Sequence, residues 1–207
     1  MKGYEMKLAT EFNPLILVGA WNKYIFNPDW IGKFLLSGET IEVEIPINAD
    51  GSPRISTENF RIFVINNKLI FSLRKDDDNI LEEIEELSLK IADYLPHTPI
   101  VAFGINFLFE CDNNSKKLQD LFSLSDSEQL IEAGCIIDSD QIKHSFVQDN
   151  RNINLTLIKQ SDAFKFDFNF HFNISNLVEF KEKINNNRLL HMKQIATSIL
   201  NDVYDVE

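Results

Sequence analysis

The residues whose types and spacing could support chemistry are few, and the first is a histidine between two prolines. His97 lies in "YLPHTPIVAFGINFLFE" (94–110), after a helical pattern and before an apolar strand pattern. On a loop held stiff by Pro96 and Pro99, its imidazole could serve as a general base or a ligand. A histidine is also typical of a helix corner, where it meets the negative end of the helix dipole. No second catalytic residue follows at a recognisable spacing, so the sequence favours the corner.

A second candidate is a pair of carboxylates followed by an imidazole. Asp138, Asp140 and His144 would share one face of a regular strand and could together bind a divalent cation. Ile142 and Phe146 fall on the same face, however, and Asp-Ser-Asp is also typical of a turn that would break the strand. The pattern therefore favours solvated side chains over a metal site.

Motifs for covalent or nucleotide chemistry are absent from the sequence. The chain has no GxSxG, Walker-A or GxGxxG pattern, and Cys111 and Cys135 have no zinc-finger spacing. Both cysteines are expected to be reduced, buried thiols. The acidic run "KDDDN" (75–79) lacks the EF-hand pattern and is expected to form a turn and helix cap. We therefore predict no metal, no cofactor and no catalytic residues, and we lean against an enzyme.

Composition and charge narrow the classes of partner. Of 207 residues 44% are hydrophobic, with 17 phenylalanines, which predicts a globular chain. With 32 acidic and 20 basic residues, the formal charge of −12 opposes direct binding to nucleic acid or to an anionic membrane. The early apolar run 15–20 is too short to span a membrane and lacks the layout of a signal peptide. We expect a cytoplasmic protein.

The strongest periodic pattern is "AFKFDFNFHFN" (163–173). Its five phenylalanines alternate with polar residues, as in a strand with one buried face. The polar face, which carries Asp167 and His171, would then face solvent or a partner.

Two further groups are candidate interaction surfaces. Glu82, Glu83 and Glu86 belong to "EEIEE", which is either a solvated helix face or an acidic contact surface. Trp21 and Tyr24 precede a predicted helix and could form an interface or the wall of a ligand pocket. Packing of the first strand on the first helix is the other interpretation of this aromatic pair.

Hydrophobic periodicity and turn residues predict the elements that position these side chains. In the first part of the chain we expect strands over 14–20, 40–47 and 100–109, a hairpin over 59–73 around Asn66–Asn67, and helices over 27–38 and 75–95. In the second part we expect a helical connector (115–132), strands over 133–150, 152–158 and 163–173, and a helical region (176–203) capped by Ser175 and broken near 185–187.

Both parts contain the order strand, strand, strand, helix, and the first part adds a strand and a helix in front and a strand behind. We therefore predict an α+β protein with a largely antiparallel sheet or sheets, helices on one face, and a ferredoxin-like duplication as the simplest topology. The predicted halves are 1–112 and 113–207, packed as one compact unit.

Three segments also give the chain a family resemblance. They are "LVGAWNKYIFNPDWI" (17–31), "LPHTPIVAFGINF" (95–107) and the late block "FHFN…LVEFKEKINNNRLLHMKQI". In these the chain resembles a sporadically distributed family of uncharacterised bacterial α+β proteins, some of them near defence or toxin modules. The resemblance implies no catalytic residues.

The first hypothesis for function is thus a non-enzymatic accessory or immunity-type subunit of a bacterial defence or toxin-related system. Its acidic surface would dock onto a basic protein partner encoded nearby. Two alternatives stay open: an enzyme centred on His97 or on the Asp138, Asp140 and His144 face, and an acidic DNA mimic. The sequence leaves the oligomeric state undetermined, since the helix after Asn173 could pack within the chain or on a second copy.

Overall fold

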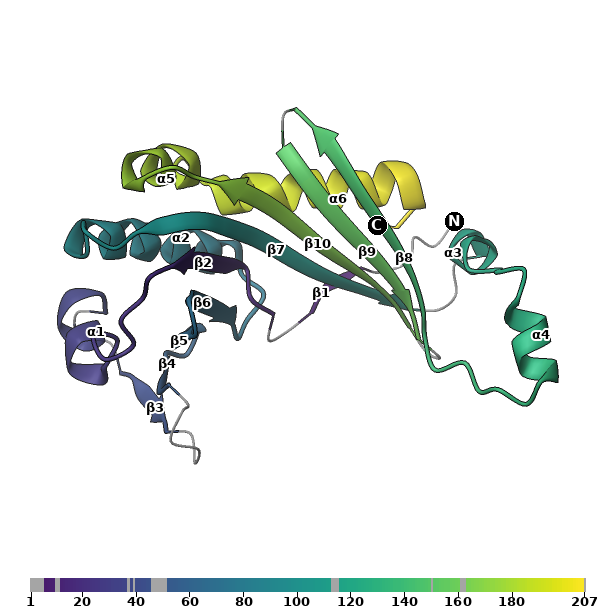
Figure 1. Ribbon diagram of the computed structural model, residues 1–207, viewed down its shortest axis with the longest axis horizontal. Coiled ribbons are helices and arrows are strands. Elements are labelled where there is room, and N and C mark those ends of the chain that lie inside the picture. Colours follow the sequence, from purple (N-terminus) through teal and green to yellow (C-terminus); the bar gives the residue numbers. More distant parts are fainter. Residues whose placement is uncertain are drawn as a thin grey trace. The chain divides into compact units, whose positions relative to one another are not determined.

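The protein combines helices with largely antiparallel strands. The structure is a computed structural model that describes residues 6–9, 12–36, 38, 40–45, 52–112, 116–149, 151–160 and 163–206. Within these ranges it contains ten strands and six helices (Figure 1), which confirms the α+β class. No described helix is both long and apolar enough to cross a membrane.

The chain divides into two compact units, each built from separate stretches. The β2 unit consists of Thr10–Asn106 and Phe170–Lys193, and the β8 unit consists of Met1–Ala9, Phe107–Asn169 and Gln194–Glu207. Each of the elements β7 (Ile100–Asp112), β10 (Ala163–Asn173) and α6 (Arg188–Tyr204) contributes residues to both units. The predicted halves 1–112 and 113–207 stay a prediction, because the compact units describe where contacts are dense and not which segments fold as domains.

Six strands of the β2 unit lie in the order β3-β4-β5-β6-β2-β7. Those not yet given are β2 (Leu15–Gly19), β3 (Glu42–Glu44), β4 (Arg54–Ser56), β5 (Phe60–Ile65) and β6 (Lys68–Leu73). The predicted hairpin over 59–73 is confirmed: β5 pairs with β6, and Asn66 supplies the left-handed turn with φ of 53°.

The apolar run at 14–20 forms the strand β2, as predicted, with one face buried and the other half-buried. Leu15 and Leu17 are fully buried, and β2 pairs antiparallel with β6 and with β7. The register with β7 shifts between Val18 and Gly19, where an added Cβ would lie 2.5 Å from a backbone oxygen. Only glycine fits at this position, because the close backbone oxygen belongs to Pro99.

The helices of the β2 unit begin at side-chain caps. They are α1 (Pro28–Phe34), α2 (Asp78–Tyr94), α5 (Leu177–Ile184) and the start of α6. Asn27 accepts from Trp30 N at 2.9 Å and Asp77 from Asn79 N at 2.9 Å, which confirms both predicted caps.

Two predicted helix boundaries are wrong. α1 ends at Phe34, with Leu35 as its C-cap, before the predicted stop at Gly38. The cap of α5 is Asn176, not Ser175, because the Asn176 side chain is the one that accepts from Glu179 N, at 3.0 Å. The predicted break between the last two helices is confirmed by positive φ at Asn186 and Asn187.

The alternating pattern at 40–47 forms a shorter and more exposed strand than predicted. β3 spans Glu42–Glu44, Val43 is 39% exposed and Ile45 is 79% exposed. β3 lies at the end of the strand order, so it has a paired neighbour on one side only, and the expected half-buried strand is wrong. Ile47, part of the same prediction, lies outside the described residues.

The β8 unit is built on a second, longer hairpin. Its elements are β1 (Lys7–Leu8), α3 (Lys116–Leu121), α4 (Ser127–Glu132), β8 (Asp140–Gln148), β9 (Arg151–Lys159), parts of β7 and β10, and the end of α6. β8 and β9 pair antiparallel over nine residues, in the order β7-β10-β9-β8, and β1 pairs with β7.

The phenylalanine stripe of β10 is buried, as its alternation predicts. The residues with at most 1% exposure are Phe164, Phe166, Phe168 and Phe170. The fifth, Phe172, is half-buried and stacks on Phe103 with ring centroids 4.5 Å apart. By contrast, the strand expected over 133–150 begins only at Asp140, since α4 ends at Glu132 and Gly134 follows with φ of 84°.

Candidate functional site

His97 occupies the corner that the sequence favours. The residue is exposed in the turn between α2 and β7, after the C-cap Leu95, and Thr98 N donates to Leu95 O at 3.0 Å. Whether His97 has a chemical role stays a prediction that the alanine variant must test.

The aromatic pair divides between core and surface. Trp21 is 8% exposed, donates from Nε1 to Leu17 O at 2.9 Å and packs edge-on against Phe26 at 5.8 Å between ring centroids. Tyr24 is 78% exposed. Trp21 therefore packs in the core of the β2 unit, and Tyr24 alone is presented at its surface.

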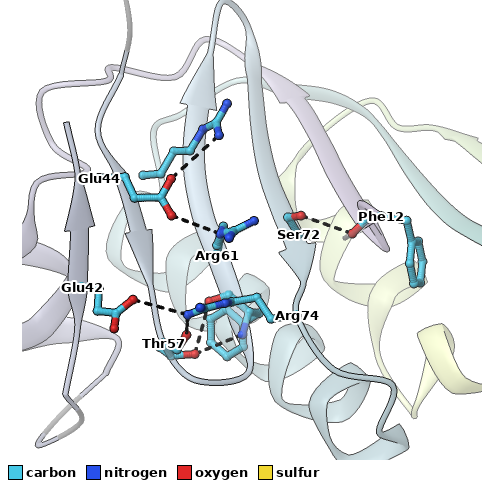
Figure 2. A network of polar contacts seen from close by, with 9 residues as sticks. Phe12, Glu42, Glu44, Thr57, Arg61, Ser72 and Arg74 are labelled. Atoms are coloured by element: carbon cyan, nitrogen blue, oxygen red, sulfur yellow. Dashed lines mark hydrogen bonds and ion pairs between the residues drawn. The ribbon is translucent and has the colours of Figure 1, made fainter. Parts of the chain in front are cut away.

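Arginines and glutamates connect the outer strands of the β2 unit. Figure 2 shows the Glu44 carboxylate of β3 between two arginine side chains. Its oxygens lie 3.9 Å from Arg54 Nη1 and 3.4 Å from Arg61 Nε. Half-exposed ion pairs of this kind contribute only about 1 kcal/mol or less each to stability. Their main effect is to hold the short strand β3 against β4 and β5.

A third arginine completes this arrangement. Arg74 lies 3.6 Å from Glu42 and donates from Nη1 to Thr57 O at 2.6 Å (Figure 2). Each of these arginines thus faces a carboxylate or a carbonyl of its own chain, which is typical of a structural network.

A pocket of about 520 Å³ borders the network, with Trp21, Lys23, Arg54 and Phe63 in its wall. The Arg54 guanidinium lies 5.3 Å from the centre of the Phe63 ring, a cation–π contact. The wall combines positive charge with aromatic surface, which suits a small anionic ligand. The Glu44 carboxylate also lines the pocket and already neutralises Arg54, so the pocket alone supports no assignment.

The acidic start of α2 is paired with the last helix. Lys193 Nζ donates to Asp76 at 3.0 Å and to Asp78 at 2.8 Å. Burial alone would lower the pKa of Lys193, but the hydrogen bonds and charges of the two aspartates outweigh it and raise that pKa above its ordinary value. Further along α2, Lys181 pairs with Asp93. Three aspartates of α2 and of the turn before it are therefore neutralised by lysines within the β2 unit.

The glutamates of "EEIEE" differ in their surroundings. Glu82 accepts from the Asn187 side chain at 3.1 Å, Glu83 is half-buried, and Glu86 is exposed. Glu85, the fourth glutamate of the run, is 5% exposed and accepts from Leu189 N at 3.1 Å. It caps the start of α6, and burial raises its pKa although these backbone hydrogen bonds oppose the shift.

The remaining predicted residues lie on strands of either unit. Asp167 in β10 is exposed as a residue, yet neighbouring atoms desolvate its carboxyl enough to raise its pKa. His171 is half-buried, with Nε2 3.0 Å from Asn173 Oδ1. Asp138 precedes β8, Asp140 begins it and His144 lies at its centre. No group of three histidine, cysteine or acidic side chains within metal-binding distance exists among the described residues.

The structure exposes a surface that the sequence interpretation missed, the α4 arm (residues 121–139). α4 has no buried residue. The exposed large apolar side chains of the arm are Leu121, Leu124, Leu130, Ile131 and Ile136, the last of them 95% exposed. Cys135, expected to be buried, is exposed as well, and this prediction is wrong: α4 has no buried residue, and residues 133–136 that follow it are all exposed.

The arm is attached to the β8 unit through α3. Leu118 is fully buried, Phe122 is 2% exposed and packs on Phe164 with ring centroids 5.6 Å apart, and Lys117 pairs with Asp205 at 2.7 Å. A groove of about 620 Å³ lies alongside the arm, lined in part by Ile131. The arm is thus anchored at its base while its apolar side chains stay accessible.

The charge of the arm has one sign. From Leu118 to Ile142 the sequence contains no lysine, arginine or histidine and six acidic residues, Asp120, Asp126, Glu128, Glu132, Asp138 and Asp140. This combination of exposed apolar and acidic side chains was the signal available in the sequence, where the segment was interpreted only as a polar helical connector.

Comparison with known proteins adds no relative. The chain matches no protein-family model and no curated protein sequence.

Proposed function

We propose that this chain is a non-enzymatic protein-interaction subunit that docks onto a basic partner through its α4 arm. The observation that carries the proposal is a helix without one buried residue, surrounded by carboxylates and bearing large exposed apolar side chains. Contiguous apolar surface with a polar rim is typical of protein–protein interfaces. The apolar side chains would supply affinity, and the carboxylates would select a cationic partner and speed encounter.

The proposal moves the predicted acidic docking surface from α2 to the arm. The aspartates at the start of α2 already have a lysine partner in the chain, whereas no basic residue falls within the arm's own sequence. A partner with an apolar groove rimmed by lysine or arginine would satisfy both features of the arm. The family resemblance adds the context: an accessory or immunity-type subunit of a bacterial defence or toxin-related system, in the cytoplasm, with its partner encoded nearby. A ferredoxin-like duplication is kept as part of the same proposal.

The test compares tagged wild-type protein with matched variants in affinity purification from the native host at low and moderate salt. Leu130→Ser with Ile131→Ser removes apolar contacts, and Glu128→Lys with Glu132→Lys reverses charge. We expect one stoichiometric basic protein to bind the wild type, to be released by salt and to be lost with both arm variants. Recovery of that protein with the arm variants, or its absence from the wild type, would overturn the proposal.

The control variant carries the same changes on another exposed helix. Val178→Ser with Glu182→Lys alters α5, where Val178 is 65% exposed and Glu182 is exposed. It should bind the partner as the wild type does. The melting temperatures of all variants should stay close to that of the wild type, because the altered side chains are exposed.

The alternatives make different predictions. A DNA mimic would lose its partner when duplex DNA is added, since both compete for one cationic site. An enzyme centred on His97 or Asp140 would lose biological activity on alanine substitution there without a fall in melting temperature.

A further inference from the structure

We propose that two copies of this chain pair through the free edge of β8, antiparallel, about a two-fold axis at His144. β8 lies at the end of the strand order, and on its outer side it pairs with no described residue. Its nine residues, DQIKHSFVQ, contain no proline or glycine, and the register with β9 runs unbroken from Asp140 to Gln148. Of the features that usually block pairing of an edge strand, β8 lacks short length, proline and a bulge, and its only charged residues are Asp140 and Lys143, one of each sign.

The inner face of β8 is only partly covered. Residues directly opposite each other in an antiparallel pair point to the same side of the sheet. Ile142 and His144 lie opposite Leu157 and Leu155 of β9, each 1% exposed. On β8 itself, however, His144 is exposed and Ile142 only half-buried. The inner face of the hairpin is thus buried at β9 but partly exposed to solvent at β8.

A groove marks this uncovered margin. It measures about 700 Å³, and its apolar wall consists of side chains from β8, β9 and the end of α6, namely Phe146, Val147, Leu155, Ile199, Val203 and Tyr204. Tyr204 packs against Phe166 of β10, with ring centroids 5.3 Å apart. α6 therefore covers the inner face at β10 but leaves Val203 51% exposed beside β8.

Charge and pattern favour a second copy as the occupant. β8 carries one acidic and one basic residue, Asp140 and Lys143, in a chain of net charge −12, so two copies repel each other little along this strand. A two-fold axis perpendicular to the sheet places the inner faces of both copies on the same side of the joined sheet. Two residues that lie opposite each other must then both have even residue numbers or both have odd residue numbers.

Among the registers that meet this condition, the one centred on His144 pairs the side chains best. It sets Ile142 against Phe146 of the other copy twice, and Lys143 against Ser145. A shift of the axis to Lys143 would place two lysines directly opposite each other. A shift to Ser145 would set Ile142 against Gln148 and lose the apolar pair. Like charges opposite one another destabilise a sheet, and apolar pairs stabilise it.

This inference is independent of the α4 arm. The neutral β8 edge has no need of a basic partner, whereas the arm carries only acidic charge. Failure of one proposal leaves the other untouched.

The first experiment measures mass by sedimentation equilibrium from low to high micromolar concentration. We expect a reversible dimer of twice the 24.0 kDa chain mass. A wild-type protein that stays monomeric over the whole range overturns the proposal, even if β8 binds a strand of another protein.

A matched pair of variants tests the charge at the edge. Ser145→Lys faces Lys143 of the other copy and should weaken the dimer about fivefold, while Ser145→Glu should tighten it by a similar factor, since each contact occurs twice. Both variants remove the same 2.8 Å hydrogen bond from Ser145 Oγ to Asn154, so its loss cannot explain opposite effects. Equal dissociation constants would overturn the register.

Cysteine cross-linking tests the register directly, in a Cys135→Ser background that removes the exposed native thiol. Opposed residues of an antiparallel pair lie within the distance that a disulfide spans. His144→Cys alone should cross-link on mild oxidation. Ile142→Cys and Phe146→Cys should each cross-link poorly alone and well when mixed. Equal cross-linking of all single variants, or none, would contradict the two-fold at His144.

Discussion

The two hairpins of the molecule are both antiparallel, but the residues of one are mostly buried and those of the outer strand of the other are not. In the β5–β6 hairpin most residues are buried, and further strands pair on both sides, β4 beside β5 and β2 beside β6. In the β8–β9 hairpin the ladder is longer, yet no residue of β8 is fully buried. Backbone pairing therefore does not by itself create core, which requires neighbours on the edges and faces as well.

Polar groups differ between the units in the same way. The β2 unit matches its buried or half-buried charges across elements, such as Lys193 with two aspartates and Glu85 with the start of α6. In the β8 unit the α4 arm exposes its carboxylates and five large apolar side chains. The first arrangement stabilises the fold, and the second is what the proposed docking surface requires.

The largest expected effect tests whether β6 is more deeply buried than β8. Phe71→Ala in β6 removes a fully buried ring and should lower the free energy of unfolding by about 3–5 kcal/mol. Phe146→Ala in β8 removes a half-buried ring and should cost about 1 kcal/mol or less. Chemical denaturation at low protein concentration, where β8 is unpaired, measures both. Similar losses for the two variants would show that β8 is as well covered as β6.

The strands show how far burial could be predicted from the sequence. Alternation predicted the buried face of β10 correctly, because five phenylalanines can hardly all be solvated. The same period at 40–47 predicted two faces but not whether either is covered, and Val43 and Ile45 are exposed. Cover depends on strand order, which is set by contacts distant in sequence.

A second, smaller effect compares an ion pair of the β2 unit with one of the β8 unit. Lys193→Met leaves Asp76 and Asp78 at the start of α2 without their lysine, and we expect a loss of about 1–2 kcal/mol because the lysine is largely buried while both aspartates are half-exposed. Lys117→Met removes an exposed pair of the β8 unit, with Asp205, and should cost about 0.5 kcal/mol or less. Thermal denaturation at fixed salt compares the two. A larger loss at Lys117 would reverse the expected order.

The pH dependence of stability tests the buried acid. Burial raises the folded-state pKa of Glu85 above its ordinary value of 4.5, so the folded protein holds this proton more tightly than the unfolded chain. The stability that it contributes is complete below pH 4.5 and is lost as pH rises through the folded-state pKa. Wild type should therefore lose stability relative to Glu85→Gln as the pH rises above 4.5 and through the raised folded-state pKa of Glu85. A constant difference would show that the pKa is not raised.

The candidate surface was less predictable than the fold, for a physical reason. Leu130 and Ile131 follow a helical pattern whether they pack against the chain or against a partner, so periodicity cannot separate the two cases. Of the predicted candidates, Trp21 is used internally as core, and Glu82 accepts a hydrogen bond from Asn187 of the same unit. What the sequence did contain was the run without a basic residue from Leu118 to Ile142.

The smallest effect concerns the cap of α5, where two neighbouring residues compete for one role. Asn176→Ala removes the acceptor for Glu179 N and should cost about 1 kcal/mol. Ser175→Ala should cost only a few tenths of a kcal/mol, because it is the Ser175 backbone N–H, bonded to the Glu179 carboxylate at 2.7 Å, that takes part in the capping, and alanine retains it. Urea denaturation of the two variants decides between them. Equal losses would mean that both side chains share the cap, whereas a several-fold larger loss for Asn176→Ala would place it at Asn176, where the extended backbone aims the amide oxygen into the first turn.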